Sequence, residues 1–546
     1  MLTKHNLFWY FIIPILIFIT VFISILPWLL ELIATPGDRI FSGINRWSTD
    51  YYIYLSYVEL GKRGILPVKL LNTTLPHPSL WAHLVYTIPG FLLGHILNFN
   101  AIFIYHFSRV IYGIFFLLAA IWFFYKLSKS RLITVTAFFL AFFVSGFAKI
   151  KSLIPFDASR YLAWLQEQNI IGRATGPLHY NAGFVMFIVS VLYYFYNRSV
   201  WWKKSIIFGF FLNLTILANP FAFLLLTLSF GLYFLVKIIS NLKNMLVLKN
   251  EFVILTLSYL LVIPLFLYFN YFLSLKPWGI VGLSPKYYIV TTPPISLTEA
   301  IMSIGPIFFL GIMGIILTIL KREVLQSKKH GIKPLNILIF LISWLIIQFF
   351  LLLFGDKVKI HPPRAFSGLY YLPLAFFSSV FIVSLAKKIT KTVRINYLWP
   401  VFLTLAILFI ITLPNYYLSF KEHLYAFTDF RSFQQLSYPT KKQVEAFAFL
   451  EKHTPAGSGV LAMFEASSLI IGFSANATEL DMPHNIKVGF YSNQMADNEA
   501  IKFLKDNRFQ YVYYGYQEKS AGGSMEKYPF LKKIYENKEV TIYKVH

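Results

Sequence analysis

The sequence predicts a polytopic α-helical membrane protein with about eleven transmembrane helices, one further interfacial or re-entrant helix, and a C-terminal extracytoplasmic α/β domain. Three observations predict this class. First, 57% of the 546 residues are hydrophobic, 13% are charged, and the mean hydropathy is +0.61. Second, apolar runs long enough to cross a bilayer recur up to residue 414. Third, the composition turns polar after that residue, as expected of a domain outside the lipid.

The charge balance indicates a membrane partner rather than a nucleic acid. Lysine and arginine total 49 against 24 acidic residues, which gives a formal charge of +25. In a membrane protein, such an excess marks cytoplasmic loops that face anionic lipid. The chain has no cysteine, which excludes disulfides, thiolate metal sites and cysteine nucleophiles.

The first apolar run, from about residue 7 to 30, is too long for the core of a signal peptide and lacks a small-residue cleavage site. It therefore predicts a retained first helix, and Lys4 predicts that the N-terminus is cytoplasmic. The predicted location of the protein is the plasma membrane. Twelve stretches are candidate spans: 8–30, 79–97, 106–125, 132–148, 180–196, 205–218, 221–236, 252–274, 299–320, 335–354, 366–386 and 396–414.

Charge parity predicts that one of the twelve does not cross. If all twelve crossed, the cluster Lys126, Lys129 and Arg131 would lie outside the cell, and every later basic cluster would also lie on the wrong side, against the positive-inside rule. The weakest stretch is 79–97, which contains His83, Pro89 and Gly90. Without it, every strong basic group is cytoplasmic: Lys126, Lys129, Arg131; Arg198, Lys203, Lys204; Lys237, Lys243, Lys249; Lys321, Arg322, Lys328, Lys329, Lys333; Lys387, Lys388, Lys391, Arg394.

An odd number of spans places residues 415–546 outside the cell. The predicted domains are therefore a membrane domain, 1–414, whose first outer loop is 31–105, and a soluble domain, 415–546. In the soluble domain the patterns predict helices at 441–453, 497–506 and 528–537, and strands at 459–464, 511–515 and 540–545. This order is typical of a small α/β domain.

Outer segments that combine charge with aromatic residues are the places where polar chemistry could occur beside lipid. The richest is the first loop, where an amphipathic helix starts near Asp50 and ends at Gly61. Thr49 or Asp50 would cap this helix, and a cap alone would explain the carboxylate. The tyrosines that follow Asp50 favour a site instead.

The second outer loop offers Asp157, Arg173 and His179. A histidine at the head of a span is more often a satisfied interfacial residue than a catalyst. A third segment places Lys276, Lys286 and Tyr287 together with further aromatic residues.

A fourth segment places Arg364 after two prolines and before a span, where its planar guanidinium would suit a lipid phosphate or serve only as an interfacial anchor. No phosphate-binding glycine loop, dinucleotide fingerprint or histidine-rich metal spacing occurs, which argues against nucleotide-driven chemistry.

The layout of one span, an acid in the first loop, a His-Pro pair at His77, a second acidic loop, many spans and an outer α/β domain resembles the GT-C glycosyltransferases. The run from Asp50 to Gly64 is similar to a D-Y-x-x-Y-L-S-x-x-x-x-G-x-x-G pattern in a group of bacterial membrane proteins of that superfamily. Many relatives carry paired acids in the first loop, whereas Ser48 and Thr49 precede a single Asp50 here.

The resemblance implies transfer of a sugar from a polyprenyl-phosphate donor to a glycan, lipid or protein acceptor at the outer membrane face. It implies that Asp50 is the catalytic acid of the first loop, that Asp157 matches the second-loop acid by location, and that Arg364 matches a basic residue before a late span. Lys276, Lys286, Tyr287, Arg173, His179 and His77 are candidates for substrate binding. Whether a divalent metal takes part in the reaction stays open, since the paired acids are missing.

Two other functions fit the same features. The first is a transporter or flippase of a lipid-linked or small polar substrate, although transporters usually place ionisable residues at the bilayer midplane. The second is a non-catalytic membrane protein that has kept the fold, because a fold by itself does not establish activity.

Overall fold

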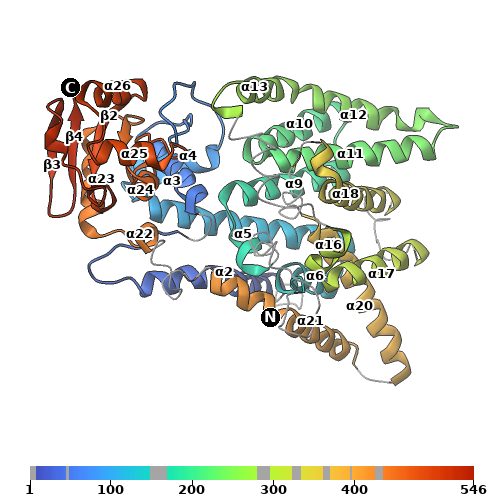
Figure 1. Cartoon of the computed structure of the whole chain (residues 1–546). Helices are drawn as coiled ribbons and strands as arrows, with labels where there is room; N and C mark the ends of the chain where they lie inside the picture. Colours follow the sequence, from blue (N-terminus) through green and yellow to red (C-terminus); the bar gives the residue numbers. More distant parts are fainter. Residues whose placement is uncertain are drawn as a thin grey trace. The chain divides into compact units, whose positions relative to one another are not determined.

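A computed structural model describes residues 8–44, 48–147, 169–279, 296–321, 334–358, 360, 369–393, 396–422, 424 and 434–546 (Figure 1). The chain forms two compact units. The first, here called the helical unit, comprises Met1–Ile25, Arg109–Asn270 and Leu283–Lys421. The second, the mixed unit, comprises Leu26–Ser108, Tyr271–Gly282 and Glu422–His546.

The described part of the helical unit consists of helices and the loops that join them. Several of these helices, α2, α5 and α13, also contribute residues to the mixed unit. Their bounds are η1 Phe8–Ile12, α2 Ile13–Ile33, α5 Ala101–Ser128, α6 Arg131–Phe143, α8 Ile170–Ala174, α9 Leu178–Tyr196, α10 Trp201–Ala218, α11 Pro220–Ser240, η5 Met245–Leu248, α12 Lys249–Leu260, α13 Ile263–Ser274, α16 Leu297–Ile304, α17 Pro306–Lys321, α18 Pro334–Phe354, η7 Gly355–Val358, α20 Tyr371–Val393 and α21 Leu398–Glu422.

Among the described residues, seven helices are long and apolar enough to span a membrane, or eight if the bent pair 245–260 and 263–274 is one span. This confirms a multi-pass membrane protein, while the total of eleven spans stays a prediction. Local sequence sets several helix starts. Asn219 caps α11 by accepting from the Phe221 and Ala222 amides, with Pro220 at the first helical position.

Contacts inside the helical unit bear on which stretches cross. Trp9, at the start of the first helix, packs edge-on against Tyr125 near the end of α5, with ring centroids 4.9 Å apart. The Tyr196 hydroxyl at the end of α9 donates to the Lys126 carbonyl over 2.8 Å. These ends lie together only if the chain crosses an even number of times between them. Two crossings between Trp9 and Tyr125, by α2 and α5, satisfy this condition, and the prediction that the stretch 79–97 does not cross stays a prediction.

The mixed unit combines the first loop with the C-terminal residues. Its first-loop helices are α3 Ser48–Lys62, α4 Leu84–Pro89 and η2 Gly90–Ile96; its later elements are α22 Gln434–Ser437, α23 Lys441–His453, β1 Gly459–Leu461, α24 Phe464–Ser474, α25 His484–Tyr491, α26 Asp497–Asp506, β2 Phe509–Tyr514, α27 Tyr516–Lys519, η8 Met525–Lys527, β3 Leu531–Glu536 and β4 Thr541–Val545. The strand order is β1-β2-β4-β3; β1 is parallel to β2, and the other two pairs are antiparallel.

The C-terminal α/β pattern is confirmed, with one correction. Helices 441–453 and 497–506 have the predicted bounds, but the predicted helix 528–537 is wrong, because residues 531–536 form β3. Asn537 explains the difference. Its amide donates to the Val540 carbonyl, and its side-chain oxygen accepts from the Glu539 and Val540 amides, which closes a hairpin between β3 and β4. Helices α24 and α25 were not predicted.

Main-chain hydrogen bonds join the first loop to the C-terminal residues. The Ile40 amide donates to the Pro439 carbonyl over 3.0 Å, and the Thr478 amide donates to the Leu71 carbonyl over 2.8 Å. Glycine allows α24 to lie close to α3, since a Cβ on Gly472 would come within 2.8 Å of the Tyr52 ring. The two segments therefore form one folded body, and the domain boundary predicted at residue 414 stays a prediction.

Candidate functional site

Asp50 lies at the exposed head of α3, in the mixed unit. The helix begins at Ser48, so Asp50 is in the first turn of the helix, and the prediction that it is the N-cap residue is wrong. In that turn a carboxylate still interacts favourably with the helix dipole. Its side chain is exposed, whereas Tyr51 and Tyr52 directly after it are buried. The carboxylate can therefore meet a substrate while its neighbours fix the helix.

Hydrogen bonds hold the head of α3 against the preceding loop. The Tyr51 hydroxyl donates to the Ser42 carbonyl over 2.8 Å, and the Tyr52 hydroxyl oxygen lies 2.9 Å from the Ser42 hydroxyl oxygen. Tyr52 also donates to the Leu436 carbonyl, which ties α22 to the same point. The His106 ring lies 2.7 Å from the Gly43 carbonyl, through Nε2. These bonds position the backbone that carries Asp50.

Aromatic rings continue along the face of α3 that carries Asp50. Tyr54 and Tyr57 follow Asp50 by four and seven residues, so the three side chains share one face. Tyr54 stacks on Tyr86 of α4, with centroids 5.0 Å apart, and Tyr57 stacks on His83 at 5.1 Å. The sequence had shown the tyrosines of α3, but their partners come from the stretch noted only as a weak span.

The rings of Tyr54, Tyr57, His83 and Tyr86 are here called the aromatic wall. Burial shifts the pKa values of two of its members. It lowers the pKa of His83 to about 4, so the imidazole is neutral near pH 7. Burial also raises the pKa of the Tyr57 hydroxyl, and the negative charge of Asp50 raises it further. Both rings are therefore neutral near pH 7.

The other end of α3 is anchored by charge. Lys62 Nζ lies 3.3 Å from Glu59 Oε1 and 2.5 Å from Glu451 Oε1 on α23. The Arg63 guanidinium donates to the carbonyls of Thr454 and Ser474 over 3.1 and 2.5 Å. Burial raises the pKa of Glu59 to about 8, against the lowering effect of Lys62. These contacts fix α3 to the C-terminal residues and lie away from the exposed acid.

His77 and Lys276 also belong to the mixed unit. The Leu70 amide donates to His77 Nε2 over 2.9 Å, so Nδ1 carries the proton that is donated to the Leu75 carbonyl over 2.7 Å. Both ring nitrogens are thus used to hold the loop. Trp278 packs its edge on this imidazole and donates to the Pro78 carbonyl over 3.0 Å. Lys276, two residues earlier, is exposed and so accessible to a ligand.

Arg173 and His179 lie in the helical unit. The Arg173 guanidinium is buried, sits 4.3 Å from the centre of the Tyr371 ring, and donates to the Ala141 and Val144 carbonyls over 2.5 and 3.3 Å. These carbonyls end α6, so the cation satisfies the C-terminus of that helix. His179 is buried in the first turn of α9, beside Tyr180. Both have structural contacts that the sequence did not reveal.

The other predicted site residues, Asp157, Lys286, Tyr287 and Arg364, lie outside the described residues. Within the ranges that the structure describes, no group of three or more histidine or acidic side chains could hold a metal ion. Of the predicted site residues that the structure describes, Asp50 and Lys276 are the exposed ones, and both belong to the mixed unit.

Comparison with known proteins gives the fold. No protein-family model matches the sequence, and neither does any curated protein. The structure is similar to the archaeal oligosaccharyltransferase AglB from Archaeoglobus fulgidus, solved with an inhibitory peptide and a dolichol-phosphate; identity is 13%, the TM-score is 0.53, and the match covers 93% of this chain and 69% of AglB.

A second structure of the Archaeoglobus fulgidus oligosaccharyltransferase, tethered to an acceptor peptide through a disulfide bond, gives 14% identity and a TM-score of 0.53 over 99% of this chain and 75% of that one. ArnT from Cupriavidus metallidurans, bound to undecaprenyl phosphate, gives 9% identity and a TM-score of 0.45 over 96% and 97% of the two chains. The oligosaccharyltransferase structures confirm that this chain has the GT-C fold.

Proposed function

We propose that this GT-C-fold chain transfers a sugar from a polyprenyl-phosphate donor to a hydroxyl-bearing acceptor at the outer face of the membrane. The observation that carries the proposal is the placement of Asp50, an exposed carboxylate at the head of a first-loop helix whose backbone is held by buried tyrosines. AglB, which has the same fold, was solved with a lipid phosphate of the dolichol class, which supports a lipid-linked donor.

The chemistry requires a base and a cationic site for the leaving group. Asp50 accepts the proton of the acceptor hydroxyl while the oxygen of that hydroxyl attacks the anomeric carbon of the sugar, from the face opposite the lipid phosphate. The bond from that carbon to the phosphate oxygen breaks, its electron pair leaves with the lipid phosphate, and the configuration inverts. A phosphate is a good leaving group, so orientation and charge compensation supply most of the remaining effect.

The cations proposed for the leaving phosphate are Lys276, Lys286 and Arg364. Lys276 is exposed in the same unit as Asp50, which supports its choice among the described residues. Asp157 is the proposed second acid, and Tyr287 a proposed contact to the sugar. A divalent metal remains a separate proposal, tested by adding a chelator to the transfer assay.

Asp50→Asn tests the base. The amide keeps the size of the side chain and removes the proton acceptor, so transfer from a labelled polyprenyl-phosphate sugar should fall by a factor on the order of 10² or more, without loss of expression. Asp50→Ala should lose transfer equally.

Asp497→Asn is the matched control, because Asp497 is also an exposed aspartate in the first turn of a helix, α26. It should transfer like wild type. Wild-type transfer by Asp50→Asn would refute the base, and the transporter function would then become the stronger candidate.

A further inference from the structure

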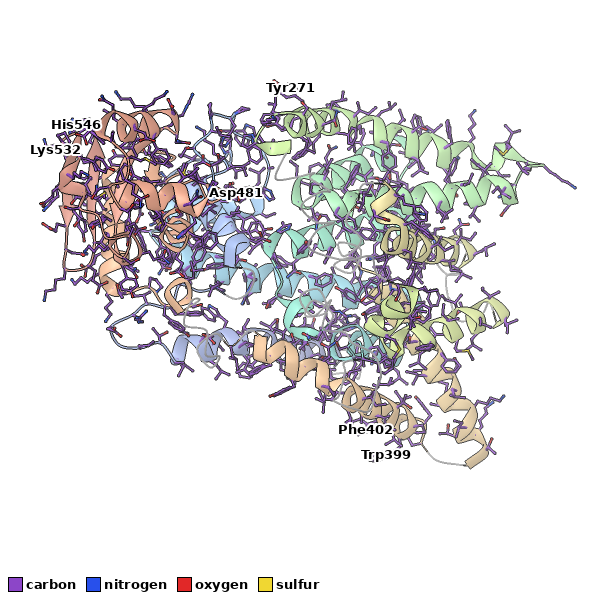
Figure 2. All side chains as sticks on the ribbon, in the orientation of Figure 1. Tyr271, Trp399, Phe402, Asp481, Lys532 and His546 are labelled. Atoms are coloured by element: carbon purple, nitrogen blue, oxygen red, sulfur yellow. The ribbon has the colours of Figure 1, made fainter. Side chains whose placement is uncertain are left out.

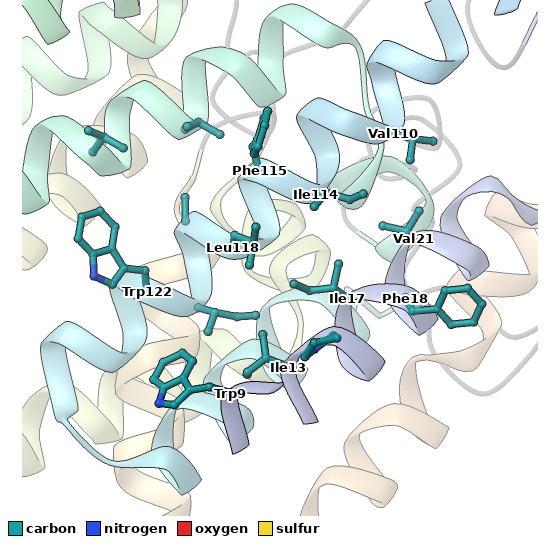
Figure 3. Close-up of a pocket in the computed structure, with 15 residues that line it drawn as sticks. Trp9, Ile13, Ile17, Phe18, Val21, Val110, Ile114, Phe115, Leu118 and Trp122 are labelled. Atoms are coloured by element: carbon teal, nitrogen blue, oxygen red, sulfur yellow. The ribbon is translucent and has the colours of Figure 1, made fainter. Parts of the chain in front are cut away.

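An apolar groove runs along the helical unit between α2, α5 and α9 (Figure 3). It has a volume of about 890 Å³, and its lining side chains are aliphatic or aromatic; Trp9, Ile17, Ile114, Leu118 and Trp122 are among them. From Trp9 to Val21, and likewise from Val110 to Trp122, the lining covers roughly 18 Å of helix, about one leaflet of a bilayer.

Three cations surround one end of this groove, each stacked on an aromatic ring. Lys126 Nζ lies 5.8 Å from the centre of the Trp122 ring, which lines the groove. Lys129 Nζ lies 5.4 Å from the ring of Tyr125, and Tyr125 packs edge-on against Trp9.

The third cation approaches through the first helix. The Arg131 guanidinium lies 5.5 Å from the Phe8 ring, and Phe8 packs edge-on against Trp9 at 5.0 Å. The indoles of Trp9 and Trp122 therefore separate an apolar channel from a cationic mouth, as the aromatic belts of membrane proteins do at the water interface.

Lys126 and Lys129 are the two lysines of this mouth. Among the residues that the structure describes, Lys126 and Lys129 form no ion pair with an acidic side chain. Burial lowers the pKa of Lys129, and the positive charge of Lys126 lowers it further. An anion bound between the two ammonium groups would relieve this repulsion.

We infer that the groove and its mouth form a binding site for an anionic glycerophospholipid, with an acyl chain along α2 and α5 and the phosphate among Lys126, Lys129 and Arg131. The apolar channel alone would accept any lipid tail, so selectivity comes from the charged mouth. The inference does not depend on sugar transfer. The proposed function has its donor phosphate at the outer face, whereas the positive-inside rule predicts a cytoplasmic mouth, so we infer a lipid other than the donor.

Lipid retention by the purified full-length protein tests the inference. We expect native mass spectrometry to show phosphatidylglycerol retained in preference to phosphatidylcholine when both are supplied in equal amounts. Lys126→Gln combined with Lys129→Gln should reduce retention of phosphatidylglycerol about tenfold, and leave phosphatidylcholine unchanged. Lys203→Gln combined with Lys387→Gln is the control, because these lysines also stack on aromatic rings, Trp202 and Tyr397, outside the groove.

Ala119→Phe tests the channel itself, since Ala119 lines the groove and a benzyl group would fill it. Retention should fall while the mouth stays intact. Equal retention of the two lipids by wild type, or unchanged retention in the Lys126 and Lys129 double variant, would overturn the site. Displacement of phosphatidylglycerol by polyprenyl phosphate would assign the groove to the donor chain instead. If the Ala119→Phe variant does not fold, the double variant of Lys126 and Lys129 still tests the site.

Discussion

Glu59 shows how one residue links the fold of α3 to pH. Its carboxylate is buried beside Lys62, which also contacts Glu451. Burial raises the pKa of Glu59 to about 8, so the folded state binds its proton more tightly than the unfolded chain does. The stabilisation from this proton is complete below the ordinary pKa of a glutamate, and is lost as the pH rises through about 8.

The thermal midpoint of the wild-type protein in detergent should therefore fall between pH 5 and pH 8. Glu59→Gln keeps a neutral side chain at every pH, so this part of the slope should disappear. Glu445→Gln is the control, because Glu445 pairs with Lys442 on the surface and should leave the slope in place. Identical slopes in all three proteins would show that Glu59 does not titrate in this range.

Glycine is required at Gly61 and Gly64, the two glycines of the motif that starts at Asp50, for different structural reasons. Gly64 has φ of +80°, a left-handed conformation that favours glycine. Gly61 lies where α3 meets the helix formed by α4 and η2. A Cβ on Gly61 would come within 2.2 Å of the Thr87 carbonyl oxygen, and a Cβ on Gly90 within 2.2 Å of the Val58 carbonyl oxygen. The aromatic wall beside Asp50 depends on this close approach of two backbones.

Gly61→Ala and Gly90→Ala should each separate the two helices and lower the free energy of unfolding by about 1–3 kcal/mol. Sugar transfer should fall with it, because Tyr86 and His83 would move from Tyr54 and Tyr57. Gly231→Ala in α11 is the control, since nothing lies near its added methyl group and alanine favours a helix. Thermal denaturation measures the difference, and equal midpoints for all three variants would contradict the proposed crossing.

For the whole molecule, the contacts at the ends of the helices agree with the charge pattern. The basic groups near residues 126, 204 and 237 lie at helix ends joined by side-chain contacts. Lys204 lies 4.8 Å from the centre of the Tyr194 ring, Tyr194 packs on Phe230, and Tyr233 and Lys237 both donate to Glu251. These groups are therefore expected at one face of the membrane, which the positive-inside rule predicts to be the cytoplasmic face.

Reporter tags after residues 128, 200, 245, 326 and 390 should all report cytoplasm. The chain has no cysteine, so Asp481→Cys and Lys532→Cys, both at exposed positions (Figure 2), provide single labels for the C-terminal residues. A membrane-impermeant maleimide should label them from outside intact cells. If the tag after 128 reports outside while the tag after 326 reports inside, the stretch 79–97 crosses and the predicted parity is wrong.

The sequence alone predicted what depends on neighbouring residues and on lipid. Long apolar runs predict membrane helices, and the residue pattern of 441–453 predicts a helix, whose start the structure shows to be capped by the Thr440 hydroxyl, which accepts from the Gln443 amide. Tertiary structure decided what depends on partners far along the chain. Residues 531–536 are a strand because β4 pairs with them, and Arg173 is occupied because α6 ends beside it. The first loop joins the C-terminal residues through main-chain hydrogen bonds, which carry no side-chain signal in a sequence.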